Sequence, residues 1–133
     1  MNFWQKLAVL AAAGLLMTAA ARAGEVYVIA NSGVTITADD VRDIFLGGKQ
    51  LAGSVKLVPV DNAAIQAQFL DKVMKMEAVK YNSAWTKKSF RDGVSPPPVK
   101  GSDAETIEFV RQTAGAVSYV GSAPTGVSVV GKF

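Results

Sequence analysis

The sequence has no cysteine and no histidine among its 133 residues. The lack of cysteine excludes disulfides, thiol nucleophiles and thiolate metal sites. The lack of histidine excludes Ser–His and Cys–His catalysis and the usual ligands of zinc and haem. The remaining serines and lysines follow no recognisable catalytic pattern. We therefore expect a protein without enzyme activity, without a cofactor and without a metal site.

The chain also has almost no net charge once residues 1–23 are left out of the count. The chain carries 14 Lys and Arg against 11 Asp and Glu, a net charge of +3. Residues 1–23 place Lys6 before an apolar run that ends in Ala-Arg-Ala, the pattern of a secretory signal peptide cleaved before Gly24. Removal of Lys6 and Arg22 leaves 12 basic against 11 acidic side chains, a net charge of +1. Because so small a charge cannot follow a phosphate backbone, we expect no nucleic-acid partner.

The same N-terminal segment raises the alternative of a membrane anchor. Its apolar run, from Leu7 to about Ala21, is about five residues short of the roughly 20 that a membrane-spanning helix needs. We therefore expect cleavage, no membrane anchor, and one domain over 24–133. Without cysteine the mature chain cannot carry the lipid of a bacterial lipoprotein, so the periplasm of a Gram-negative cell is the expected location.

Hydrophobic periodicity and capping residues predict the element order β-α-β-α-α-α-β-β. Strands are expected over 25–30, 55–60, 116–120 and 127–130, and helices after Thr37, after Asp61-Asn62, over 77–89 and after Ser102. Tyr81 and Trp85 are expected to be buried, and a loop stiffened by Pro96-Pro97-Pro98 is expected after the third helix. Alternating strands and helices favour an α/β domain whose sheet is covered on both faces and at least partly parallel.

Two polar segments mark a candidate ligand site. Asn31 and Ser32 follow the first predicted strand, and Asp61-Asn62-Ala63-Ala64 follows the second. Ligands of open α/β sheets bind at the carboxyl ends of parallel strands, and unpaired N–H groups at helix starts favour anions. A small oxyanion is the expected ligand. The alternative is that these side chains only cap their own helices.

Three stretches in this order resemble the phosphate-type substrate-binding proteins of ABC uptake systems. They are Ile36 with Asp40-Val-Arg-Asp-Ile-Phe-Leu-Gly47, then Leu57-Val-Pro-Val-Asp61 leading to Phe69, and finally Gly115-Ala-Val-Ser-Tyr-Val120. The resemblance implies a single lobe of a type 2 periplasmic binding protein, with a mixed, mostly parallel sheet flanked by helices. It also implies a role in binding phosphate or another small anion beside an ABC permease.

The sequence departs from that family where the anion is held. The family's phosphate loop reads Ser-Gly-Thr after an Arg, whereas this chain has Ala63-Ala64-Ile65 after Pro59. Full-length members close two lobes on the anion, and 110 residues supply one, so a cleft would need a homodimer or another envelope protein. The alternative function is an interaction module that kept the lobe and lost the anion site.

Overall fold

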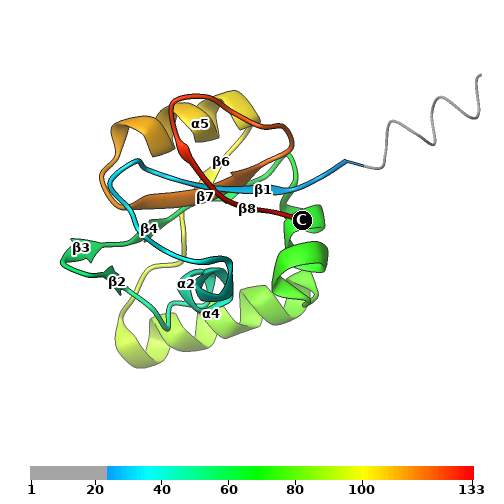
Figure 1. The fold of residues 1–133 in the computed structure, drawn as a ribbon. Coiled ribbons are helices and arrows are strands. Elements are labelled where there is room, and N and C mark those ends of the chain that lie inside the picture. Colours follow the sequence, from blue (N-terminus) through cyan, green and yellow to red (C-terminus); the bar gives the residue numbers. More distant parts are fainter. Residues whose placement is uncertain (1–23) are drawn as a thin grey trace, which may run out of the picture.

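The computed structural model describes residues 24–133 (Figure 1), so the signal peptide expected over 1–23 lies outside the described residues. A sheet of four strands has the order β4-β7-β1-β8. The strands are β1 (Tyr27–Ala30), β4 (Val58–Pro59), β7 (Ala116–Val120) and β8 (Ser128–Lys132). β1 is antiparallel to both β7 and β8, and β4 is parallel to β7.

The expected mixed sheet is confirmed, but the expectation that it is mostly parallel is wrong. The alternation of strands and helices suggested a partly parallel sheet covered on both faces, and the family resemblance implied a mostly parallel one. Here both faces of the sheet are covered while most pairs are antiparallel. The covering of both faces was therefore predicted correctly, and the direction of most strands was not.

The strand expected over 55–60 is divided between two sheets. β3 (Val55–Lys56) pairs antiparallel with β2 (Leu51–Ala52) in a hairpin, and only β4 joins the main sheet. The chain then enters β5 (Asp61–Asn62), which pairs parallel with β6 (Val99–Lys100). The expectation that Asp61-Asn62 caps a helix is therefore wrong, because the backbone of these residues is used for strand pairing.

The helices are short except for two. Their bounds are η1 (Ala38–Asp40), α2 (Val41–Phe45), α3 (Gln66–Phe69), a π-helical turn η2 (Leu70–Met74), α4 (Ala78–Asp92) and α5 (Asp103–Gln112). The predicted cap of α5 is present, since Ser102 Oγ accepts a hydrogen bond from Glu105 N at 3.2 Å. α4 extends past its predicted end at residue 89 to Asp92 and is capped by Gly93, whose φ of 68° is readily adopted by glycine.

The core lies on both sides of the sheet. Alternate residues of β1 and β7, such as Val28 and Tyr119, pack against α2, α3, η2 and α4, while Ile29 and Val120 pack against α5. Figure 1 shows α5 above the sheet and α2 and α4 below it. Within residues 24–133 no helix is long and apolar enough to span a membrane.

Candidate functional site

The structure places the two predicted site segments at opposite ends of the sheet. The last residue of β1, Ala30, lies beside Val117 of β7 in an antiparallel pair, whereas Pro59 of β4 lies beside the same Val117 in a parallel pair. The chain therefore leaves β1 and β4 in opposite directions. The expectation that their carboxyl ends meet at one edge is wrong, because it required both strands to run parallel.

Asn31 has a structural role at the end of the sheet where β1 ends. Its Nδ2 donates to the carbonyl oxygens of Val110 at 3.0 Å and Arg111 at 3.2 Å, so it ties the end of β1 to the end of α5. Its Oδ1 accepts from Gly33 N at 3.1 Å. Ser32 is exposed beside it. Both the nitrogen and the oxygen of the Asn31 side-chain amide are therefore hydrogen-bonded within the chain, and this segment forms a turn.

Asp61 is a buried carboxylate at the other end. It is 2 % exposed, and its two oxygens accept from the hydroxyls of two buried tyrosines, Tyr119 to Oδ1 at 2.7 Å and Tyr81 to Oδ2 at 2.9 Å. Burial raises the pKa of Asp61, and the two tyrosine hydroxyls partly oppose that rise because they stabilise the charged form. The pKa values of both tyrosines are raised, first by burial and then by the nearby carboxylate.

Asn62 joins this end of the sheet to the start of α5. Its Nδ2 donates to Asp103 Oδ1 at 2.7 Å and to the carbonyl oxygen of Tyr119 at 3.0 Å, and its Oδ1 accepts from Ala64 N at 3.1 Å. The other oxygen of Asp103 accepts from Gly121 N at 3.0 Å. This network is satisfied internally, which is what a buried amide requires.

The backbone of Ala63 and Ala64 is not free to bind an anion. Ala63 N donates to the carbonyl oxygen of Lys100 at 2.8 Å, and Ala64 N donates to Asn62 Oδ1. The helical segment formed by α3 and η2 begins only at Gln66, so Ala63 and Ala64 precede its first turn. The carboxylates of Asp61 and Asp103 both lie at this end. These features disfavour a dianion at the predicted position.

A hollow of about 520 Å³ opens beside Asp61 between α4 and the proline-rich loop. Its lining is Asp61, Gln66, Tyr81, Asn82, Trp85, Thr86, Ser89, Phe90, Pro96, Pro97 and Val99. Tyr81 and Trp85 are buried as predicted, and Trp85 Nε1 donates to the carbonyl oxygen of Phe45 at 2.9 Å. The sequence pattern indicated their burial but did not show that they border a hollow, because the loop that completes it follows 11 residues after Trp85.

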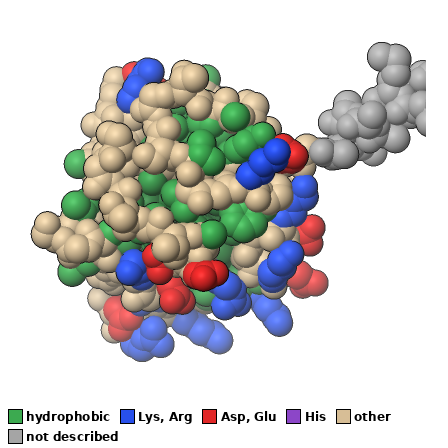
Figure 2. Space-filling view, viewed as in Figure 1, with side chains coloured by type: hydrophobic (Ala, Val, Ile, Leu, Met, Phe, Trp, Pro, Cys, Tyr) green, Lys and Arg blue, Asp and Glu red, His purple; other side chains and the backbone are tan. Residues whose placement is uncertain are grey.

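Charged side chains gather on the α4 side of the molecule with both signs interspersed (Figure 2). On α4 itself Asp92 pairs with Lys88 at 3.3 Å and with Arg91 at 3.1 Å. Exposed pairs of this kind neutralise each other and contribute little to stability. α4 also carries Lys80 and Lys87, so its cations outnumber its single carboxylate and the helix keeps a net positive charge.

No protein-family model and no curated protein matches the sequence. Among solved structures, a protein from Clostridium perfringens assigned as a phosphate ABC transporter substrate-binding protein, with bound phosphate, is similar with a TM-score of 0.60 at 13% identity. The match covers 80% of this chain and 45% of that chain. PstS from Borrelia burgdorferi is similar with a TM-score of 0.52 at 13% identity, over 73% of this chain and 41% of that chain.

The chain spans less than half the length of these two solved structures. At such identities the likeness shows the fold alone. It confirms the predicted resemblance at the level of fold: an α/β unit with a mixed sheet flanked by helices, similar to part of the C. perfringens protein.

Proposed function

We propose that this protein is an exported, non-enzymatic binding protein, built as one lobe of the substrate-binding-protein fold, that does not hold phosphate at the end of β4. The fold shared with the C. perfringens protein supports a binding role. The lack of cysteine and histidine supports binding without chemistry. Export to the periplasm rests on the signal-peptide pattern of residues 1–23.

The observation that carries the proposal is the internal use of the Ala63 and Ala64 N–H groups. A phosphate in this position needs several donors, and a bidentate guanidinium is the strongest of them. Here both N–H groups already donate within the chain, Pro59 stands where the family has Arg, and the Asp61 carboxylate is buried close by. Of the two functions that the sequence left open, these features favour the second, an interaction module that has kept the lobe and lost the anion site.

Full-length members of the family that this chain resembles hold their anion in a cleft between two lobes, so we propose that a second surface completes such a cleft here. An ABC permease or another envelope protein is the first candidate, because proteins of this fold include ABC transporter components. A second copy of this chain is the other candidate. Size-exclusion chromatography with mass measurement distinguishes a monomer from a dimer.

Thermal unfolding in a series of oxyanions tests the central claim. A ligand that binds only the folded state raises the melting temperature in a saturable way. We expect phosphate and sulfate to shift the melting temperature no more than sodium chloride at equal ionic strength. A saturable rise specific to phosphate would contradict the proposal, and the same rise together with a doubled mass would favour two lobes closing on an anion.

A rebuilt loop provides the matched comparison. The variant with Pro59→Arg, Ala63→Ser, Ala64→Gly and Ile65→Thr carries the residues of the family's phosphate loop at the corresponding positions. Stabilisation of this variant by phosphate, with none in the parent protein, would show that the loss lies in these four side chains. No stabilisation in either protein would show that these four side chains are not sufficient, and that the hydrogen bonds within the chain or the lack of a second lobe also prevent binding.

A further inference from the structure

A second hollow, of about 520 Å³, adjoins the one beside Asp61 and shares Trp85, Pro96 and Pro97 with it. Much of its wall is apolar, with contributions from Leu57, Val58 and Pro59. It lies where the chain passes from the β2–β3 hairpin into β4, next to the segment that rises from the end of α4 to β6 (Figure 1). We call it the lysine hollow, after Lys49 and Lys56 in its lining.

The charges of the lysine hollow have one sign. Lys49 and Lys56 contribute to its lining, and no Asp or Glu does. Within residues 24–133, neither Lys49 nor Lys56 forms an ion pair with a carboxylate oxygen within 4.0 Å. The ion pairs there involve other cations, such as Lys88 and Lys132. Asp40 is also within electrostatic range of Lys49: its pKa is lowered first by the hydrogen bond from Thr37 N, and Lys49 is the last of the causes.

The walls of the lysine hollow are rigid. Trp85 is 5 % exposed and is fixed by its hydrogen bond to Phe45, and Leu57 is also 5 % exposed. Three consecutive prolines, whose φ angles are locked, form one side. Gly47 approaches Trp85 so closely that an added Cβ would lie 3.0 Å from its ring. A preformed pocket of this kind orders few groups on binding, which favours affinity.

We propose that the lysine hollow binds a small organic anion: one carboxylate, held by Lys49 and Lys56, attached to an apolar body that packs on Trp85 and the prolines. The apolar wall distinguishes this ligand from an inorganic oxyanion. Phosphate would have to face Leu57 and Pro59 on one side and lose its water there without new hydrogen bonds. An aromatic or alicyclic carboxylate instead buries its apolar part against that wall and keeps its charge at the lysines.

This inference rests on the proposed role as a binding lobe, but it places the ligand in a hollow that Asp61 does not line. The phosphate titration described above decides the proposed function, and a separate titration with organic acids decides this inference. Either can fail without the other.

Calorimetric titration of the purified protein with benzoate, benzamide and acetate tests the inference. Benzoate and benzamide share an apolar ring and differ in charge, while acetate keeps the charge and lacks the ring. We expect saturable binding of benzoate, with benzamide and acetate each at least several-fold weaker. Equal affinity for benzoate and benzamide, or no binding of benzoate, would overturn the inference.

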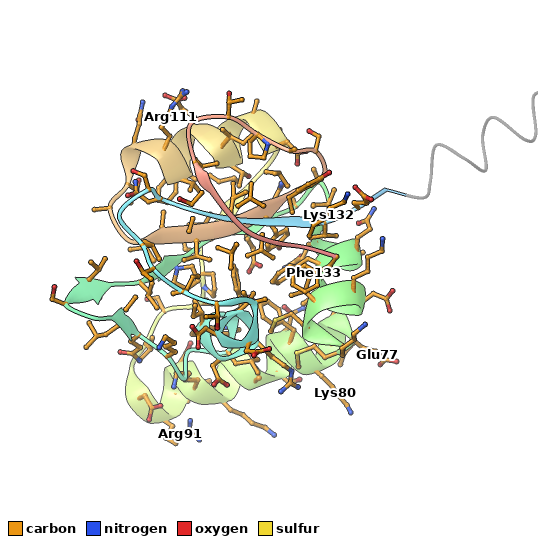
Figure 3. The ribbon with its side chains drawn as sticks, viewed as in Figure 1. Glu77, Lys80, Arg91, Arg111, Lys132 and Phe133 are labelled. Carbon is orange, nitrogen blue, oxygen red and sulfur yellow. The ribbon has the colours of Figure 1, made fainter. Side chains whose placement is uncertain are left out.

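Matched lysine variants test the two cations. Lys49→Gln/Lys56→Gln is expected to weaken benzoate binding about tenfold, since each partly exposed ion pair contributes roughly threefold, and to leave benzamide binding unchanged. Lys80→Gln is the control, because Lys80 lies on α4 and points away from the molecule (Figure 3). An unchanged benzoate affinity in the double variant, with its melting temperature preserved, would refute the role of the lysines.

Discussion

The hydrogen bond between Tyr119 and Asp61 makes the sharpest stability prediction. Tyr119→Phe removes one hydroxyl and keeps the ring, which stacks on Phe69 with centroids 3.7 Å apart. The Tyr119 hydroxyl donates to Asp61 Oδ1 at 2.7 Å, and both residues are buried. The variant therefore leaves one oxygen of a buried carboxylate without this donor and changes little else.

The expected loss at neutral pH is about 2–3 kcal/mol, because a hydrogen bond to a charged group contributes about that much and its loss leaves the acceptor unpaired. For a domain of this size it corresponds to a fall in melting temperature on the order of 10 °C. Tyr81→Phe removes the partner bond to Asp61 Oδ2 and should show a similar loss.

The loss should depend on pH, and its sign follows from the pKa of Asp61. Burial raises that pKa above its ordinary value of 3.8, and the Tyr119 hydroxyl lowers it in part. Below pH 3.8 the carboxyl is protonated in the folded and the unfolded chain, so Tyr119→Phe costs only a neutral bond, about 1 kcal/mol. As the pH rises through the folded-state pKa, the variant must ionise Asp61 with one donor fewer, and the loss grows to its full value.

Urea unfolding at about pH 3 and at pH 7 measures this difference. In an Asp61→Asn background the effect of Tyr119→Phe should be small and independent of pH, because the titrating group is gone. An equal loss at both pH values in the parent protein would refute the argument that Tyr119 stabilises the charged form of Asp61.

Three further predictions follow from single residues. Asn62→Ala should lower the free energy of unfolding by about 2 kcal/mol, because its amide joins Asp103, Tyr119 and Ala64, and denaturant unfolding measures the loss. Gly115→Ala should destabilise more than Gly53→Ala, which should cost about 1 kcal/mol. Both glycines have positive φ, but an added Cβ would lie 2.0 Å from a backbone oxygen at Gly115 and in open space at Gly53. N-terminal sequencing of the exported protein should begin at Gly24, and an uncleaved N-terminus would contradict the signal-peptide prediction.

Much of the local structure could be predicted from the sequence because it depends on neighbours within a few residues. The buried strand over 116–120 follows from its apolar run, and the start of α5 follows from Ser102 and Glu105. The burial of Tyr81 and Trp85 follows from their helical spacing on α4. In each case the side chains that favour the element lie within a few residues of the backbone that forms it.

The candidate site could be predicted only in part. The side chains of Asn31 and Asn62 serve local turns rather than the helix caps that the sequence left open as the alternative to a ligand site. What could not be predicted is that Asp61 accepts hydrogen bonds from the hydroxyls of Tyr81 and Tyr119, which are 20 and 58 residues away in the sequence. No spacing rule connects residues so far apart.

The sequence by itself determined where most of the longer strands and helices lie, that Tyr81 and Trp85 are buried, and that histidine and cysteine chemistry is excluded. Only the tertiary structure decided which way the strands run, and hence that Asn31 and Asp61 lie at opposite ends of the sheet. The physical reason is that an apolar run reports burial on both faces, while strand direction is set by pairing with distant partners, such as Val28 with Tyr119.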